Sequence, residues 1–487
     1  MEHRTGTERV RETVRTGPWR HLYEDLSGRD PVSLAAVDSE ALAEAAWWLC
    51  KTDESIAARQ RAYAAFRDAK DDRGAARTAA RLFHDHFYRG EGAVAVGWLR
   101  RGFRHVQRDP DSVEAGWLQM AKAELHLHQG PLEQAVDGAA QATQRARDHG
   151  DADLAAVAMQ IQGRALVAQG RITEGLALLD DAMTCVLAGE LAPLYTGWVY
   201  CSVILACKDL ADLQRASEWT EAARVWCEAL PATTPYSQGL CRIYRGEVLA
   251  LRGAWDEAET ELRHAHQQLL PHKPQGAAEA SYGVGEVLRR RGDRAGAEQA
   301  FVRAQQLGWD PQPGMALLRL DQGRVDVAAA ALRSALASHT VDRFGRARLL
   351  AAQVEVTIAA GALDEARHAA RELMTIADGL SSAVVRATAS MAQGVLQLAA
   401  ASPAAALEQL RGALNGWREL QLPYEEATAR LLIGTTQRML GDEEGGRIEI
   451  DAARAGFDRL GAAADAGRAT ALLQRGRAPR QVLTDRE

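Results

Sequence analysis

The stretch GALDEA at residues 361–366 decides the fold, because close copies of it recur along the chain. Each copy starts with glycine or another small or polar residue, often has an apolar residue two places later, and usually ends on alanine or glycine. Clear copies are GRITEG at 170–175, GAWDEA at 253–258 and GDRAGA at 292–297. Further copies begin at Gly90, Gly130, Gly323 and Gly441, and weaker ones at Thr52, Ala211 and Ala401. Successive copies start 31 to 42 residues apart, mostly near 40, and so regular a period is typical of a solenoid.

Small residues flank these turns at fixed distances. Two antiparallel helices that meet at a tight turn need small residues where their backbones approach most closely, and glycine ends the first helix with a positive φ at low cost. Seven residues before the turn lie Ala45, Ala123, Gly163, Gly246, Gly285, Ala316, Gly394 and Gly434. Twelve residues after it lie Ala64, Ala142, Ala182, Ala223, Ala265, Ala304, Ala335, Ala413 and Ala453.

The residues between the turns have a helical pattern. In DADLAAVAMQIQGRALVAQG, residues 151–170, apolar residues recur at three- and four-residue steps after Asp151, which is a plausible N-cap. Alternating Val-rich runs of the kind found in strands do not occur. We therefore expect an all-α superhelix of about eleven helical hairpins between about residue 39 and about residue 460.

Length, charge and cysteine content narrow the class of protein. A chain of 487 residues exceeds the usual size of one core, so it must form several domains or a repeat array. A net charge of −7 argues against a large nucleic-acid surface. The sequence has no signal-peptide core near its start and no apolar run of the roughly 20 residues that a membrane span needs. Six cysteines without a C-x-x-C pair do not indicate a disulfide framework, and we expect a cytoplasmic protein without a membrane partner.

Motifs for catalysis or metal binding are not found. No lysine follows a glycine, which excludes a P-loop, and no G-x-S-x-G or H-E-x-x-H occurs. Three H-x-H pairs occur, but residues two apart on a helix point away from each other. We therefore expect no catalytic residue, no cofactor and no metal, and interpret these pairs as ordinary helix-end histidines: His84/His86, His126/His128 and His264/His266.

The cysteines allow two interpretations. Cys201 and Cys207 face different ways on one predicted helix, while Cys185, Cys227 and Cys241 lie on other helices. Small buried side chains in crowded hairpins account for them. A redox or zinc sensor is the alternative.

Small residues at minus seven, plus five and plus twelve from a turn resemble the tetratricopeptide signature. The period near 40 is longer than the usual one of about 34, and is similar to that in the regulatory region of MalT-like, LuxR-type bacterial transcription regulators. Residues 200–231, YCSVILACKDLADLQRASEWTEAARVWCEALP, resemble the middle of that region. Residues 422–462, LPYEEATARLLIGTTQRMLGDEEGGRIEIDAARAGFDRLGA, resemble its last repeat.

The resemblance implies a right-handed α-α superhelix in three parts. Cap helices would occupy residues 1–38, the repeat solenoid 39–460, and a tail or linker 461–487. We expect one ring of the pair Trp47–Trp48 to face the cap helices, because adjacent rings cannot both be buried on one side of a helix.

The last five residues, LTDRE at 483–487, are similar to the L-T-x-R-E that opens the family's helix-turn-helix DNA-binding domain. Leu483, Thr484, Arg486 and Glu487 fit that opening, and Asp485 takes the variable position. The resemblance implies a regulator whose DNA-binding domain is absent from these residues. A chance match at a chain end is the alternative.

Aromatic residues are concentrated in the central region. Trp198, Tyr200, Trp219 and Trp226 are candidates for a groove that binds a ligand or partner, and core packing is the alternative. We expect a regulatory module that binds a protein, peptide or small-molecule effector and controls an attached DNA-binding domain, without binding DNA by itself. A homodimer is compatible with the sequence. The alternative function is a free-standing adaptor that scaffolds protein partners.

Overall fold

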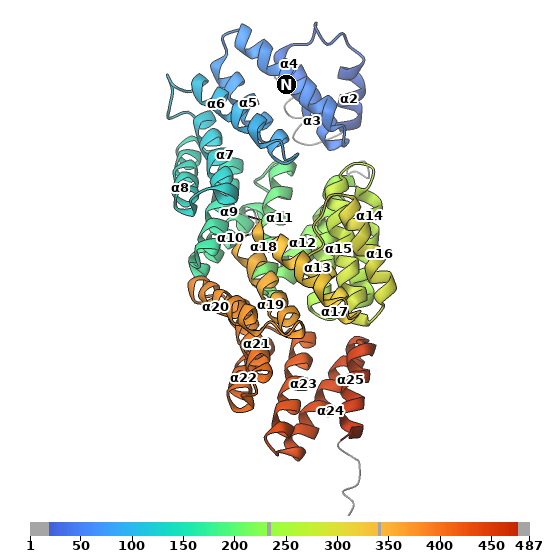
Figure 1. The fold of residues 1–487 in the computed structure, drawn as a ribbon. Coiled ribbons are helices and arrows are strands. Elements are labelled where there is room, and N and C mark those ends of the chain that lie inside the picture. The colour runs from blue at the N-terminus through green and yellow to red at the C-terminus, as the bar shows by residue number, and fades with distance from the viewer. Residues whose placement is uncertain (1–18, 231–234, 339–341, 476–487) are drawn as a thin grey trace, which may run out of the picture. The chain divides into compact units, whose positions relative to one another are not determined.

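The computed structural model describes residues 19–230, 235–338 and 342–475, and these residues form helices and turns without β-strands (Figure 1). Eleven helical hairpins follow one another along this part of the chain, with α2 (Trp19–Ser27) before them and α25 (Ala463–Arg475) after them. The predicted fold class, an all-α tetratricopeptide-like solenoid, is confirmed.

The first helices of the hairpins are α3 (Ala36–Trp48), α5 (Asp72–Phe87), α7 (Val113–Gln129), α9 (Ala152–Gln169), α11 (Pro193–Asp209), α13 (Pro235–Leu251), α15 (Pro274–Arg291), α17 (Gly314–Asp321), α19 (Arg343–Ala359), α21 (Ala383–Ala399) and α23 (Pro423–Met439). The second helices are α4 (Thr52–Asp68), α6 (Gly92–His105), α8 (Leu132–His149), α10 (Ile172–Leu187), α12 (Leu213–Ala229), α14 (Trp255–Leu269), α16 (Arg294–Gln306), α18 (Val325–Ala337), α20 (Leu363–Leu380), α22 (Pro403–Glu419) and α24 (Glu443–Leu460).

Left-handed backbone lies at most of the predicted turns. Ala211 and Ala401 adopt it with φ of 54° and 56°, although a Cβ atom makes this region costly. The predicted N-cap at Asp151 is confirmed, because its Oδ1 accepts a hydrogen bond from the backbone N–H of Leu154 at 2.9 Å. Glycines with φ between 74° and 91° occupy the turns at Gly90, Gly170, Gly253, Gly292, Gly323, Gly361 and Gly441.

Two turn predictions are wrong in detail. Gly130 is extended, with φ −129° and ψ −168°, because it precedes Pro131 and a proline confines the residue before it to extended backbone. In the first hairpin the left-handed residue is Cys50, with φ 60°, whereas Thr52 is already the first residue of α4. The register of this repeat therefore shifts by two residues, and Ala62 rather than Ala64 is fully buried.

Small residues lie where the two helices of a hairpin cross. A Cβ atom added to Gly163 would lie 2.7 Å from the carbonyl oxygen of Gly175, and one added to Gly175 would lie 2.6 Å from the carbonyl oxygen of Gly163. The helices α9 and α10 therefore meet backbone to backbone. Ala265 and Ala304, at the plus-twelve position, have no exposed surface. These positions are small because a larger side chain has no room there.

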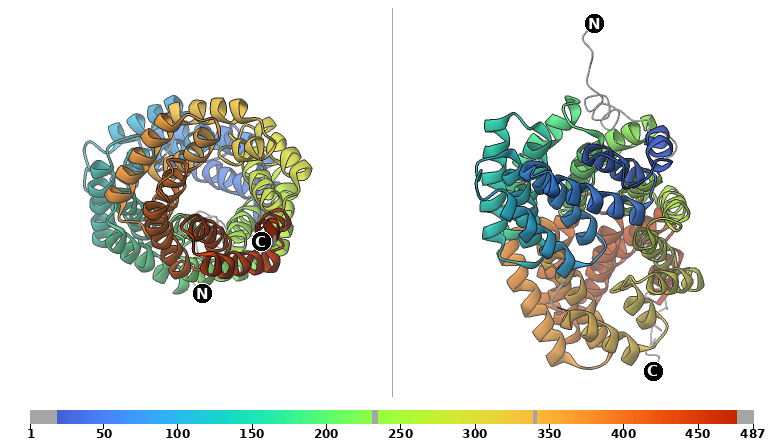
Figure 2. Two further views of the ribbon diagram at one scale, coloured as in Figure 1. Left: turned by 60° about the horizontal axis from the view of Figure 1, so that its bottom comes forward. Right: turned by 90° about the horizontal axis from the view of Figure 1, so that it is seen from above.

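The chain divides into two compact units, which are described separately. Unit 1 contains the described residues within 1–206, 218–244 and 268–273, and unit 2 those within 207–217, 245–267 and 274–487. In unit 1 the first helices α5, α7 and α9 contact one another in turn, and in unit 2 α17, α19, α21 and α23 do so. Figure 2 shows the helices of the chain from two further directions. Second helices of successive hairpins make no comparable contacts among the described residues, so these first helices form a layer of their own in each unit.

One repeat is shorter than the others. Only 31 residues separate the turns at Gly292 and Gly323, and the helix between them, α17, has 8 residues, whereas α15 and α19 have 18 and 17. The missing residues would have formed about two further turns of this first helix.

Among the described residues, α2 and the start of α3 lie in the predicted N-terminal part, and α25 lies in the predicted tail. Trp48 stacks on Trp19 of α2 with ring centroids 4.0 Å apart, which confirms that one ring of the Trp47–Trp48 pair faces the N-terminal helix. Within the predicted tail, α25 contacts α24, while the LTDRE match lies outside the described residues. The division at residues 38 and 460 stays a prediction. None of the described helices is both long and apolar enough to span a membrane.

Candidate functional site

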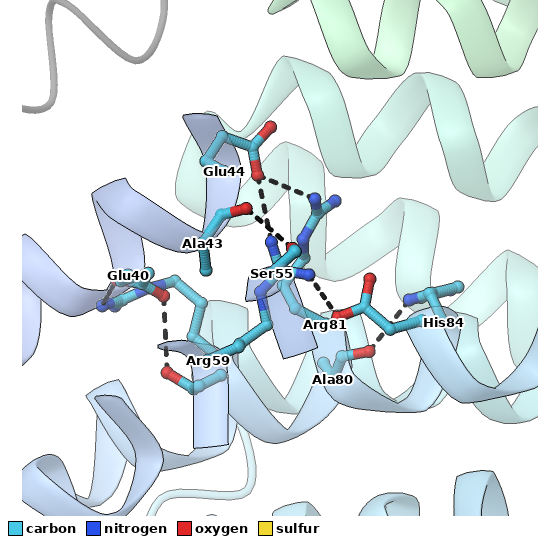
Figure 3. A network of polar contacts seen from close by, with 11 residues as sticks. Glu40, Ala43, Glu44, Ser55, Arg59, Ala80, Arg81 and His84 are labelled. Carbon is cyan, nitrogen blue, oxygen red and sulfur yellow. Dashed lines mark hydrogen bonds and ion pairs between the residues drawn. The ribbon is translucent and has the colours of Figure 1, made fainter. Parts of the chain in front are cut away.

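A buried ionic network joins α3, α4 and α5 of unit 1. Arg59, with 1% of its side chain exposed, donates Nη1 to Asp85 Oδ2 at 2.5 Å and Nη2 to Glu44 Oε2 at 3.3 Å. Arg81 donates to the same Glu44 oxygen at 2.9 Å, so that two arginines converge on one carboxylate (Figure 3). Removal of one partner would leave a buried charge without compensation. The network therefore holds α5 in one orientation against α3 and α4.

A second buried pair joins α5 to α7. His84 Nε2 lies 2.9 Å from Glu124 Oε2, and these two side chains are 4% and 3% exposed. His84 Nδ1 lies 2.9 Å from the carbonyl oxygen of Ala80, which only accepts hydrogen bonds, so Nδ1 carries a proton. Tyr88 donates its hydroxyl to the other oxygen of Glu124 at 2.5 Å. Burial alone would raise the pKa of Glu124, but the hydrogen bonds and charge of its partners hold that pKa below its ordinary value.

Aromatic rings cover this buried pair. The ring centroid of Trp198 on α11 lies 4.9 Å from that of His84 and 5.9 Å from that of Tyr88. The ring centroid of Phe87 lies 5.7 Å from that of Tyr88 and 5.4 Å from that of His128 on α7. Tyr88 is 46% exposed, whereas Phe87 and Trp198 are half-buried. We call Phe87, Tyr88, His128 and Trp198 the aromatic surface of unit 1.

Arg81 places a positive charge beside the rings of α11. Its guanidinium carbon lies 5.9 Å from the ring centroid of Tyr195 and 6.0 Å from that of Trp198, within cation–π range. Burial lowers the pKa of Arg81, but Glu44 and the other acidic groups nearby outweigh burial and raise it above its ordinary value. Burial raises the pKa of Tyr195 to about 12. At neutral pH a charged guanidinium therefore lies beside an uncharged phenol.

The four residues predicted to line a groove fall into different environments. Trp198 belongs to the aromatic surface, as described above. Tyr200 is only 4% exposed, with its ring centroid 5.8 Å from that of Trp226, whose ring lies against Gly197. Trp219 is half-buried, and its Nε1 is buried without a hydrogen-bond partner. Side chains two positions apart on a helix differ in direction by about 200°, so Trp198 and Tyr200 face different ways. A binding role for these residues stays a prediction.

The interpretation of His84 as a helix-end residue agrees with its place in the last turn of α5, but it missed that the packing of α5 on α7 buries His84 against Glu124. The repeated sequence pattern could have predicted the pair of His84 and Glu124. Both residues stand six positions before the left-handed or extended residue that ends their first helix, as does Glu44 before Cys50. This minus-six position is charged or histidine in seven hairpins: Glu44, His84, Glu124, Arg164, Glu247, Glu286 and Glu355.

Unit 2 has a related cluster formed by α15, α23 and α25. The guanidinium carbon of Arg290 lies 5.0 Å from the ring centroid of Tyr424, and its Nη2 donates to Glu425 at 3.2 Å. Tyr424 donates its hydroxyl to Asp465 at 3.0 Å, and its ring lies 5.7 Å from that of Trp255. Burial raises the pKa of the Tyr424 phenol. Each unit therefore combines arginine, carboxylate and aromatic side chains on its first helices.

These clusters combine aromatic rings with charged groups. Aromatic faces, guanidinium groups and carboxylates recognise apolar and charged groups of a partner. Over the ranges that the structure describes, no group of three or more His, Cys, Asp or Glu side chains is arranged to hold a metal ion.

Comparisons with known proteins do not identify a family. No protein-family model and no curated protein matches the sequence. The chain is similar to one in the crystal structure of the APC/C hetero-tetramer Cut9–Hcn1, with 12% identity over 96% of each chain and a TM-score of 0.49. It is also similar to Rap protein complexed with competence and sporulation factor, with 13% identity over 66% of this chain and 98% of the other and a TM-score of 0.43.

Likeness at this level carries no conclusion about function. The class of protein, an all-α tetratricopeptide-like repeat protein, follows from the hairpins, turns and crossings described above. The resemblance to LuxR-type regulators is not shown by these comparisons.

Proposed function

We propose that this chain is a partner-binding repeat module, and that a protein or peptide binds at the aromatic surface of unit 1. The observation that supports the proposal is Tyr88, a residue that is 46% exposed although its hydroxyl is held by the buried carboxylate of Glu124. Rings that are already fixed lose little conformational freedom when a partner binds. Large aromatic side chains also dominate the energetics of many protein interfaces.

The aromatic surface favours a segment that inserts an apolar side chain. Tyr88 and Trp198 approach edge to face, at an interplanar angle of 66°, and Phe87 and His128 extend the surface along α5 and α7. An apolar side chain laid on these rings would remove apolar area from water on both partners, at about 25 cal/mol for each Å². A peptide or a protein loop can supply such a side chain.

A finer proposal follows from the resemblance of residues 200–231 and 422–462. The module would be the regulatory region of a LuxR-type transcriptional regulator and would control an attached DNA-binding domain. An effector achieves such control only if it binds one arrangement of the repeats more tightly than another. A free-standing adaptor is equally consistent with the fold. The coding sequence after Glu487 separates the two, because a regulator requires a helix-turn-helix domain in the same reading frame.

Selection of peptides on the immobilised chain tests the binding surface. We expect Tyr88→Ala and Trp198→Ala to weaken the selected peptides at least tenfold, which corresponds to about 1.4 kcal/mol. Val94→Ala is the matched control, because Val94 is also 46% exposed but lies on α6, the second helix of the same hairpin. Unfolding curves of the three variants establish that each is folded. Peptides that bind both aromatic variants as tightly as the parent would contradict this location.

A further inference from the structure

Two cysteines of unit 1 lie side by side although they belong to successive hairpins. Cys227 stands near the end of α12, and Cys241, 14 residues later, lies in the first half of α13. Their Sγ atoms are 2.7 Å apart. A disulfide bond is about 2.05 Å long, so a movement of about 0.7 Å would bring the two atoms to bonding distance.

We propose that Cys227 and Cys241 form a dithiol site that oxidises reversibly to an intramolecular disulfide and so links two successive repeats covalently. The oxidant is a small-molecule disulfide, such as oxidised glutathione. A thiolate of the protein attacks one sulfur of the oxidant and releases one reduced thiol. The second cysteine then attacks the mixed disulfide and releases the other. One protein disulfide and two reduced small-molecule thiols result, so atoms and electrons balance.

The burial of the two residues gives the order of the steps. Cys227 is 4% exposed, whereas Cys241 is only partly buried, so the oxidant reaches Cys241 first and Cys227 resolves the mixed disulfide. A hydrogen bond with the neighbouring thiol, together with burial, raises the pKa of Cys241. The first attack is therefore slow at neutral pH, and the equilibrium between dithiol and disulfide is the quantity to measure.

Two aromatic residues belong to the surroundings of this site. Both thiols act electrostatically on Tyr200, whose pKa is raised mainly by burial, and the ring of Trp226 contacts that of Tyr200. Trp226 directly precedes Cys227 in α12. A disulfide between Cys227 and Cys241 would therefore form among residues of the central aromatic region, apart from the aromatic surface, and the inference does not depend on the proposed function.

Peptide mapping of the full chain tests the proposal. The reduced, folded protein is equilibrated with mixtures of reduced and oxidised glutathione, the remaining thiols are alkylated, and the digest is analysed by mass spectrometry. We expect one cross-linked peptide pair that joins Cys227 to Cys241, and its recovery as two free peptides after reduction. Cys227→Ala should instead accumulate glutathione on Cys241, because the resolving thiol is absent. Cys201→Ser is the matched control, since Cys201 is the other cysteine close to Cys241, and it should keep the cross-link.

Three results would overturn the inference. The first is a parent protein whose Cys227 and Cys241 both stay reduced while other cysteines react. The second is a disulfide between Cys201 and Cys241 in place of the proposed one. The third is stable glutathione on Cys241 of the parent, which would show that Cys227 does not resolve it. The same mixtures applied in concentrated urea provide the comparison for an unfolded chain, in which this pair should lose its preference.

Discussion

The crossing of α9 and α10 makes a prediction about a single methyl group. Gly163→Ala adds a Cβ atom that would lie 2.7 Å from the carbonyl oxygen of Gly175 and 2.9 Å from Cγ of Leu179. The leucine can change its rotamer, but the carbonyl oxygen belongs to the backbone of α10 and moves only with the helix. The substitution therefore has to separate two helices that are in backbone contact.

Two opposing effects determine the magnitude. Overpacking of a well-packed contact costs about 1–3 kcal/mol, and the backbone contact places this case in the upper part of that range. Alanine is a better helix former than glycine in a helix interior by roughly 0.5–1 kcal/mol, which offsets part of the loss. We expect Gly163→Ala to lower the free energy of unfolding by about 1–2 kcal/mol.

Gly97→Ala provides the matched control. Gly97 lies in the interior of α6, and a Cβ atom added there would meet nothing within 4 Å. Only the gain in helix propensity applies, so this variant should be more stable than the parent by up to about 1 kcal/mol. Urea unfolding followed by far-UV circular dichroism measures both, with midpoints compared at equal slope. A shift of both variants in the same direction would refute the argument that the crossing, rather than helix propensity, decides the outcome.

Three further predictions use the same measurement. Ala265→Leu, at a crossing without exposed surface, should lower stability by about 1–3 kcal/mol, and an unchanged midpoint would contradict the repeat register. Ala401→Gly should raise stability by about 1 kcal/mol, because φ is 56° at this exposed turn; a loss would show that no strain is stored there. Glu124→Gln should destabilise the protein fully above about pH 5 and progressively less below about pH 4: the folded pKa of Glu124 lies below the unfolded value of about 4.3, so its ionic contribution is lost as the pH falls through the folded pKa. A difference from the parent that does not change with pH would argue against a charged Glu124.

Local sequence was sufficient to predict the hairpins, because the constraints on a tight turn between helices act within a few residues. Gly361 and its equivalents reveal a left-handed backbone through residue type alone. Cys50 adopts the same conformation without a glycine, and the sequence pattern therefore places the first turn two residues too late. At Gly130 the following proline overrides the glycine, and both residues of this conflict are visible in the sequence.

The candidate site could be predicted only in part, because it depends on contacts one or more repeats apart. The density of aromatic residues indicates Trp198, but its partners Tyr88 and His84 stand more than a hundred residues earlier in the chain. Composition alone does not show which aromatic rings are in contact with each other. The proximity of Cys227 and Cys241 likewise depends on how α12 meets α13, and helical spacing within one element does not contain that information.

Different contacts hold the molecule together within a hairpin and between hairpins. Within a hairpin, small residues allow close apolar contact, and the strength of this contact does not depend on charge or on pH. Between successive first helices, polar pairs recur with one partner from each repeat: Arg81 with Glu44, Tyr88 with Glu124, and Lys208 with Glu247. Such a buried pair rearranges at low cost only where a bound partner supplies a hydrogen bond in place of the one that is lost.

Sensitivity to a bound partner should therefore lie between repeats rather than inside them. A segment seated on the aromatic surface lies directly beside the bond from Tyr88 to Glu124, which joins α5 to α7. A partner that favours one geometry of this bond would change the angle between two hairpins while each hairpin keeps its own packing. The free energy available for such a change is limited to the difference in the partner's affinity for the two geometries. Regulation through this module thus requires that the ligand contact at least two successive first helices, which the aromatic surface, built from α5, α7 and α11, would allow.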